Sequence, residues 1–256
     1  MTIGNQAEWE DQAAVAIEEA VAWHSVGIIS DNGQAIGTGV AATYGSHHVF
    51  ITAAHVVAGQ ELQSLQYLFR PTGPLVWAEL AEVSSRRAEV VVTPRETVVI
   101  ERVLTDDVLD LAFLLVPPEL KNRSRIRFFE LGKDSLTPPE GTTIRLRGYP
   151  SDVALPMGGT DKLVLPAVVW GTIDNKRPPE KFDPKTEFLV PYAFAEVGKH
   201  ARGFSGAGAW FHDSPTAVWH PNLGLAGICT AYYAKSRVLS IVKIESVIGA
   251  LEKLIR

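Results

Sequence analysis

Three residues in this sequence have the chemical types that nucleophilic catalysis of acyl transfer requires, and each stands in a distinct local context. Ser205 lies in the run Gly203-Phe204-Ser205-Gly206, His55 ends the run Ile51-Thr52-Ala53-Ala54-His55, and Asp110 opens the run Asp110-Leu111-Ala112. A serine hydroxyl is a poor nucleophile until a base removes its proton, and an imidazole oriented by a carboxylate is such a base. The residues therefore predict a catalytic triad of His55, Asp110 and Ser205.

The glycines beside the serine predict the second part of such a site. Gly203 can adopt backbone angles closed to other residues, so that its N–H and the N–H of Ser205 can point at one developing oxyanion. Gly206 leaves room for a substrate carbonyl. A bare G-x-S-G also occurs as a glycine-rich turn with an incidental serine, and the upstream His55 and Asp110 are what favour catalysis here.

Local context also selects the histidine and the acid. The apolar run 49–54 predicts a strand, and His55 follows where the chain leaves it. Asp106, Asp107 and Asp110 all precede the apolar run 111–116, but only Asp110 abuts it, so its carboxylate can be buried against an imidazole. Asp106 and Asp107 are expected in the turn. With one cysteine and no H-E-x-x-H motif, we expect no metal site and no cofactor.

Composition and charge exclude several classes of protein. The 256 residues, 46% of them hydrophobic, can form one or two globular domains. The net charge is -5, with -7 on residues 1–69 and +2 on the rest, which argues against a nucleic-acid partner. No run approaches the roughly 20 apolar residues of a membrane span. Cys229 is the only cysteine and the first 24 residues carry acids without a basic leader, so we expect a cytoplasmic protein.

The periodicity of apolar residues predicts an all-β protein with a helix at each end. Residues 1–24 are expected to form an acidic amphipathic helix, and helical spacing returns at 247–255. Between them, β-branched and aromatic runs separated by turn residues predict strands. These runs are 25–29, 36–42, 49–54, 74–79, 88–93, 97–103, 111–116, 142–148, 164–171, 186–192, 207–211, 224–231 and 238–243.

The sequence resembles the trypsin/chymotrypsin superfamily, particularly its bacterial members without disulfides. The motifs that carry the resemblance are Gly37-Thr38-Gly39, Thr52-Ala53-Ala54-His55, Asp110-Leu111-Ala112, Gly148-Tyr149-Pro150, Gly203-Phe204-Ser205-Gly206 and Gly224-Leu225-Ala226-Gly227-Ile228. The resemblance implies two six-stranded antiparallel barrels: 25–117 carrying His55 and Asp110, and 126–256 carrying Ser205. The proline-started segment 118–125 would be the crossover.

The same resemblance implies how substrate is held. The amides of Gly203 and Ser205 would form the oxyanion hole, and Thr230, Ala231 and Tyr232 would pair with the substrate backbone. Many family members have an aspartate before the nucleophile that pairs with a new N-terminus after zymogen cleavage. Phe204 stands there in this chain, so that activation route is absent and the oxyanion hole would form without cleavage.

The candidate specificity residues lie in the segment before Ser205 and in the strand predicted to bind substrate. Lys199, six residues before Ser205, stands where trypsin-like enzymes set the base of the primary pocket, and a lysine there would favour an acidic side chain before the scissile bond. His200 or Arg202 could supply that charge instead. Tyr232 could narrow the pocket and favour small residues.

The resulting prediction is a serine endopeptidase of narrow specificity that cleaves protein or peptide substrates through an acyl-enzyme on Ser205. The alternative is a catalytically inactive or partner-activated binding module with a peptidase fold. An α/β-hydrolase is disfavoured because it needs G-x-S-x-G and the order Ser, acid, His. A regulatory protein partner could dock on the acidic N-terminal helix, or that helix could simply cap the fold.

Overall fold

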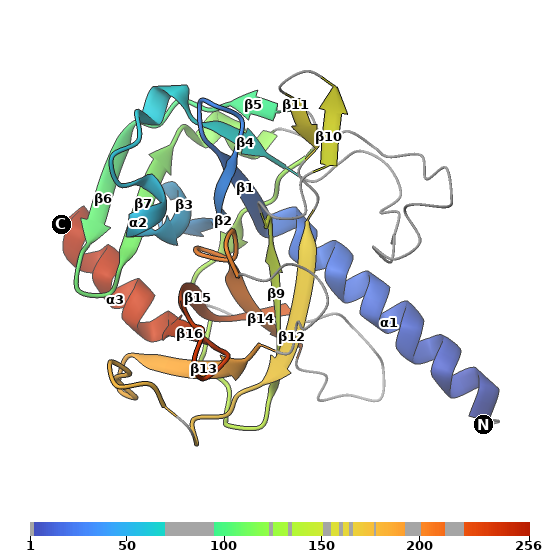
Figure 1. The fold of residues 1–256 in the computed structure, drawn as a ribbon. Coiled ribbons are helices and arrows are strands. Elements are labelled where there is room, and N and C mark those ends of the chain that lie inside the picture. Colours follow the sequence, from blue (N-terminus) through green and yellow to red (C-terminus); the bar gives the residue numbers. More distant parts are fainter. Residues whose placement is uncertain are drawn as a thin grey trace.

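The computed structural model contains two large, mainly antiparallel sheets, with a helix at each end of the chain (Figure 1). It describes residues 3–69, 95–122, 125–132, 135–150, 155–158, 161–163, 166–176, 178–192, 201–212 and 223–256. Side chains are described from Ala14 onward, apart from those of 155–163.

The first sheet contains the segments expected to carry the histidine and the acid. Its strands lie in the spatial order β5 (Arg95–Thr97), β4 (Gln66–Leu68), β1 (Ser25–Ile29), β2 (Ala35–Tyr44), β3 (His47–Ala53), β7 (Leu111–Val116) and β6 (Arg102–Asp106). A two-residue strand, β8 (Phe129–Glu130), pairs in parallel with β2. Two short 3-10 helices, η1 (Leu62–Ser64) and η2 (Pro118–Asn122), lie in its connections.

The second sheet follows in the chain and leads into the C-terminal helix. Its six strands lie in the order β12 (Ala167–Thr172), β9 (Thr143–Gly148), β14 (Gly208–His212), β15 (Leu223–Tyr233), β16 (Val238–Lys243) and β13 (Glu187–Pro191). A separate hairpin pairs β10 (Leu155–Gly158) with β11 (Asp161–Leu163). Mostly-β content in two sheets confirms the chymotrypsin-like fold class that the sequence predicts.

Burial explains why these runs form strands. β1 is buried at every position and β7 at all but one, so the first sheet is covered on both faces along these strands. One apolar cluster joins them, because Val40, Ile51 and Phe113 of the first sheet pack with Trp210 and Leu225 of the second.

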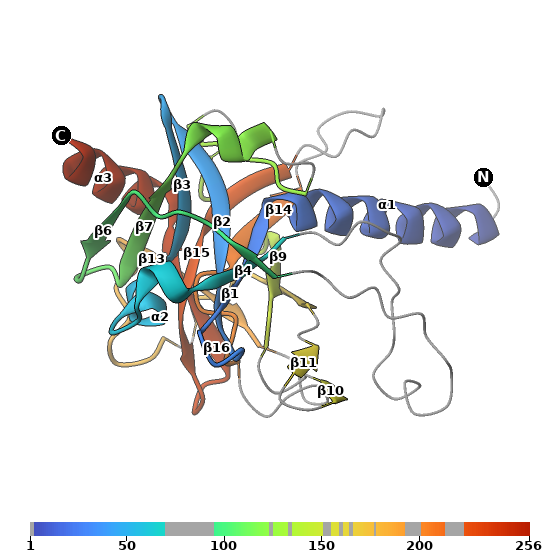
Figure 2. The same cartoon turned by 90° about the horizontal axis from the view of Figure 1, so that it is seen from above.

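The terminal helices close this shared core. α1 (Ile3–His24) leads away from the sheets toward the N-terminus (Figures 1 and 2), while Ile17 and Val21 near its C-terminal end are buried in the shared core. α3 (Ile244–Ile255) buries Val247 and Leu251 in the same cluster. α3 therefore packs on the core through an apolar face, as its spacing predicts, whereas α1 contacts the core through Ile17 and Val21 near its C-terminal end.

Some details differ from the expectations. The run 97–103 is not one strand, because β5 ends at Thr97 and β6 begins only at Arg102. Ala54, expected to end a strand, begins the short helix α2 (Ala54–Val57). In the described part of the chain the first sheet has eight strands where six were expected, the additions being short. The predicted strands 74–79 and 88–93 lie outside the described residues.

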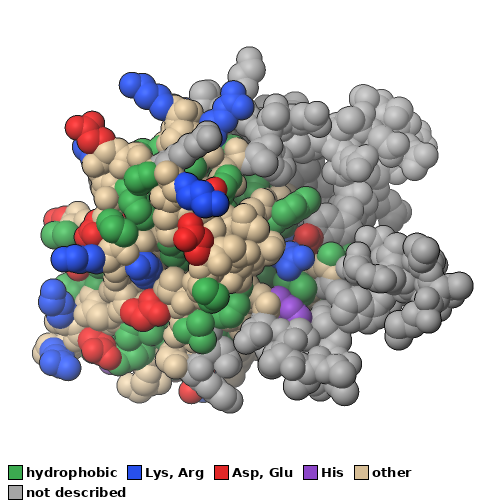
Figure 3. Space-filling view, turned by 90° about the horizontal axis from the view of Figure 1, so that it is seen from below, with side chains coloured by type: hydrophobic (Ala, Val, Ile, Leu, Met, Phe, Trp, Pro, Cys, Tyr) green, Lys and Arg blue, Asp and Glu red, His purple; other side chains and the backbone are tan. Residues whose placement is uncertain are grey.

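The described surface mixes charges. On the face shown in Figure 3, Lys and Arg side chains are interspersed with Asp and Glu among the coloured residues. Among the described helices, none is long and apolar enough to span a bilayer.

Candidate active site

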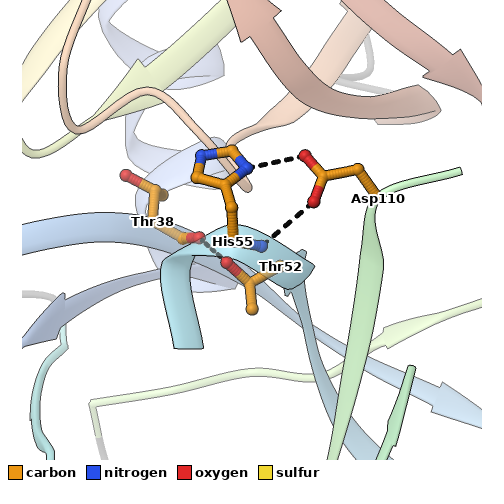
Figure 4. Close-up of polar contacts among 4 residues, drawn as sticks. All are labelled: Thr38, Thr52, His55 and Asp110. Atoms are coloured by element: carbon orange, nitrogen blue, oxygen red, sulfur yellow. Dashed lines mark hydrogen bonds and ion pairs between the residues drawn. The ribbon is translucent and has the colours of Figure 1, made fainter. Parts of the chain in front are cut away.

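His55 stands where a strand turns into a helix, and Asp110 holds it there. β3 ends at Ala53, and the N–H of Ala54, the first residue of α2, donates to the carbonyl of Asp110 at 2.9 Å. The next N–H, that of His55, donates to Asp110 Oδ1 at 3.0 Å, and the ring nitrogen Nδ1 lies 2.6 Å from Oδ2 (Figure 4). Both carboxylate oxygens therefore bind one histidine, which fixes its ring.

Asp110 comes from the hairpin between β6 and β7. Asp106 pairs with Leu111 across the hairpin, and Oδ1 of Asp106 accepts the N–H groups of Val108 and Leu109 at 3.1 and 3.0 Å. Asp110 ends the turn in the left-handed region, with φ of 53°. Asp is among the few residues other than Gly that tolerate this conformation. It directs the backbone carbonyl and the carboxylate of Asp110 at the start of α2.

The electrostatics of the pair suit a base. The hydrogen bond to Asp110 raises the pKa of His55 above the 6.5 usual for histidine, while partial burial acts in the opposite direction. The His55 side chain is 51% exposed and that of Asp110 38% exposed. Since Nδ1 faces the carboxylate, the neutral ring carries its proton on Nδ1 and leaves Nε2 free to accept another.

Two glycines with positive φ angles shape the backbone of the loop that carries Ser205. Gly203 has φ of 96° and Gly206 has φ of 86°, which side chains rarely allow. The N–H of Gly206 donates to the carbonyl of Cys229 at 2.7 Å, which ties the loop to β15. Within the described residues, the N–H groups of Gly203 and Ser205 donate no hydrogen bond to the protein.

Two buried threonines of the first sheet link that loop to the strand that leads to His55. Thr38 of β2 donates its N–H to the carbonyl of Ser205 at 2.8 Å and its hydroxyl to the carbonyl of Gly203 at 2.5 Å. Thr52, three residues before His55, donates its hydroxyl to the carbonyl of Thr38 at 2.6 Å (Figure 4). Neither threonine was assigned a role from the sequence, although both stand in motifs of the family resemblance.

The approach of α2 to the serine loop depends on a missing side chain. A Cβ on Gly37 would overlap Val56 of α2 and lie 3.1 Å from the carbonyl oxygen of Ser205. Gly37 therefore lets the elements that carry His55 and Ser205 lie side by side. The structure thus holds His55 and Asp110 in direct contact and joins Ser205 to them through β2 and β3.

Phe204, next to the serine, is an apolar anchor. Its side chain is 2% exposed and belongs to the core of the second sheet. Its ring makes an edge contact with Tyr192 at 6.2 Å between centroids, and Tyr192 contacts Tyr232 at 5.1 Å. Packing of the Phe204 ring in this core therefore fixes the position of the serine loop.

The strand segment expected to bind substrate lies directly beyond this loop. β14 pairs with β15 only as far as Ile228, whereas β16 pairs with it up to Tyr233. A bulge between Cys229 and Ala231 displaces Thr230, which is buried, while Ala231 and Tyr232 are half-buried. Among the described strands, residues 230–232 therefore have one open edge, which a further strand could occupy.

The remaining candidate residues precede the serine loop. Lys199 and His200 lie outside the described residues, and Arg202 is exposed at the start of the serine loop. In the part of the chain that the structure describes, no three His, Cys, Asp or Glu side chains gather as metal ligands would.

Comparison with known proteins gives a family match and several matches to solved structures. A family model described as a trypsin-like peptidase domain matches residues 37–213, a range that includes His55, Asp110 and Ser205. No curated protein matches the sequence.

Solved structures share the fold at low identity. Human heparin binding protein has a TM-score of 0.54 and 14% identity, covering 90% of this chain and 91% of its own. An inactivated protease paralogue of the scabies mite has a TM-score of 0.57 and 15% identity, covering 92% and 94%. The active form of the Rv3671c protease of M. tuberculosis has a TM-score of 0.53 and 16% identity, covering 95% and 86%.

Proposed function

Because this chain belongs to the trypsin-like peptidase family, we propose that it is a serine endopeptidase that hydrolyses peptide bonds through an acyl-enzyme on Ser205. The observation that carries the proposal is the two-point contact of Asp110 with His55, at 2.6 Å to the ring and 3.0 Å to the backbone. This contact presents Nε2 of a neutral imidazole as the base.

In the proposed mechanism, His55 moves one proton in each half of the reaction. Nε2 takes the hydroxyl proton of Ser205 as the oxygen attacks the peptide carbonyl, and returns it to the leaving amine. Water then attacks the acyl-enzyme with His55 again as base, which releases the acid and restores Ser205. Asp110 keeps its charge throughout and stabilises the imidazolium formed in each step.

The carbonyl oxygen of the substrate would become the oxyanion beside the N–H groups of Gly203 and Ser205. Two features of the loop support this role. Neither N–H group donates a hydrogen bond to the described residues, and the positive φ of Gly203 sets the direction in which its N–H points. Donors fixed before the reaction need no reorganisation when charge develops.

Substrate would enter as an added strand along 230–232, where β15 has its open edge. Lys199 would favour an acidic side chain before the scissile bond, with His200 and Arg202 as the other cations available. Tyr232 would limit the size of that side chain. Narrow specificity of this kind would restrain the activity.

A binding module is the alternative, because an inactivated protease paralogue shares this fold. A fluorophosphonate probe separates the two, since it reacts only with an activated serine. We expect the probe to label the native protein, and Ser205→Ala to abolish labelling and lower kcat on a peptide library by roughly 10⁵–10⁶-fold with the fold intact. Full activity of Ser205→Ala, or no labelling of the native protein, would overturn the proposal.

A further inference from the structure

A pocket of about 340 Å³ lies beside His55, on the flank of α2 that faces the β6–β7 hairpin. We call it the α2 pocket. Val56 points the other way, toward Gly37 and the carbonyl of Ser205. His55, the neighbour of Val56 in α2, lines the α2 pocket. The pocket is lined by Ala54, His55, Val57, Ala58, Gln60, Leu62, Val103, Thr105, Asp107 and Asp110.

The α2 pocket combines apolar walls with negative charge. Ala54, Val57, Leu62 and Val103 supply carbon surface, and two carboxylates, those of Asp107 and Asp110, supply charge. Among the described residues, no lysine or arginine lines it. A lining of this kind fits a side chain with an apolar stem and a positive tip. The volume lies in the range of pockets that bind small organic groups.

The two carboxylates differ in what they already bind. Asp110 uses both oxygens on His55. Asp107 is exposed, and within the described residues its carboxylate has no hydrogen bond or ion pair. Asp106, its neighbour, is committed to the turn through the amides of Val108 and Leu109. Asp107 is therefore the group left to bind a cation.

We propose that the α2 pocket binds a Lys or Arg side chain of the substrate close to the scissile bond, with Asp107 pairing with its charge. The inference rests on the proposed peptidase function. A peptide attacked by Ser205 with His55 as base must pass the pocket's mouth, because His55 is part of its wall. This preference is separate from the one proposed for Lys199 and concerns a different residue of the substrate.

The test compares arginine with citrulline, its uncharged isostere, in otherwise identical peptides, scanned through each position flanking the cleaved bond. At one position we expect kcat/KM to be about two- to fivefold higher for arginine, the size of an ion pair with an exposed carboxylate. The ratio should fall toward one in Asp107→Asn and also at high salt, which screens the pair. Glu61→Gln is the matched control: it removes an exposed acid between Gln60 and Leu62 that does not line the pocket, so the ratio should persist.

The outcomes separate this inference from the proposed function. If the protein is labelled by the fluorophosphonate and cleaves the citrulline peptides, but shows no arginine preference at any position, the pocket assignment is wrong and the peptidase stands. If it neither labels nor cleaves, the proposed function fails. The pocket is then judged by fluorescence anisotropy of the same peptides on Ser205→Ala protein, which needs no turnover. Equal affinity for arginine and citrulline peptides there would overturn it, and an arginine preference lost in Asp107→Asn would support it.

Discussion

The backbone N–H of Thr38 donates to the backbone carbonyl of Ser205 at 2.8 Å, across the boundary between the two sheets. This bond is one of a set, since the Thr38 hydroxyl also donates to Gly203 and accepts the N–H of Tyr149 at 3.1 Å. Ser205 lies in a loop that leads into the second sheet, and His55 follows a strand of the first sheet. Thr38 sets their relative position, because it binds the serine loop on one side and Thr52 on the other.

Removing the Thr38 hydroxyl should loosen the serine loop without unfolding the protein. Thr38→Val keeps the shape and the backbone bond but loses the bonds to Gly203 and Tyr149. We expect kcat to fall about tenfold, the value of one or two positioning hydrogen bonds. Thr38→Ser, which keeps the hydroxyl, is the control and should retain most activity. Equal kcat for the Val and Ser variants would show that the hydroxyl has no positioning role.

The pH dependence of activity should report the contact between Asp110 and His55. Only neutral His55 can act as base, and its raised pKa means that kcat/KM should increase with pH around a midpoint above 6.5. Asp110→Asn removes the main cause of the raised pKa, so the midpoint should move to lower pH. The same change should lower kcat by about 10⁴-fold, because an amide no longer selects the tautomer. An unchanged midpoint in Asp110→Asn would contradict this account.

Phe204 should affect turnover through the loop that it anchors. We expect Phe204→Leu to lower kcat about tenfold while KM changes less, because loosening the proposed oxyanion hole would weaken binding of the transition state more than binding of the substrate. Phe188→Leu is the matched control, since Phe188 is 1% exposed in the same core cluster but belongs to β13. Both variants should lose similar stability in thermal unfolding. If both also lost kcat equally, Phe204 would be an ordinary core residue.

His24 at the end of α1 should make folding stability depend on pH. Burial lowers its pKa to about 4, and the ring lies against Phe129 and Trp210. Between this pKa and the usual value of about 6.5, the unfolded chain binds a proton at His24 that the folded chain does not. The free energy of unfolding should therefore fall by about 1.4 kcal/mol for each pH unit as the pH drops from about 6.5 toward 4. Urea unfolding across this range should show a shallower loss in His24→Gln than in the native protein. Parallel profiles would rule out this contribution.

Burial patterns explain which parts of the fold the sequence predicts. The run 111–116 corresponds to β7 because an apolar run between turn residues leaves few alternatives. The run 97–103 misled for a physical reason: Val98 and Ile100 are buried while Val99 and Glu101 are exposed, which is the alternation of a strand. Alternating burial shows that one face of a segment is covered, but it does not show that a neighbouring strand is hydrogen-bonded to that segment.

The sequence indicates the reactive side chains of the candidate site but not the residues that position them. His55, Asp110 and Ser205 have side chains whose chemistry is evident from their type. Thr38 and Thr52 look like ordinary strand residues, because threonine is common in sheets. The partner of the Thr38 hydroxyl is 165 residues away in sequence, so its role appears only once both sheets are in place.

The left-handed backbone of Asp110 restricts the evolution of this position. Replacement by Glu, the nearest acid, would keep the charge but strain the turn, so it is not a neutral step. Asn and Gly accept the same backbone, and either change would spare the hairpin while removing the carboxylate. Under the proposed function, lineages that drift here would lose turnover before they lose the fold, which offers a short route from a peptidase to a stable protein without catalytic activity.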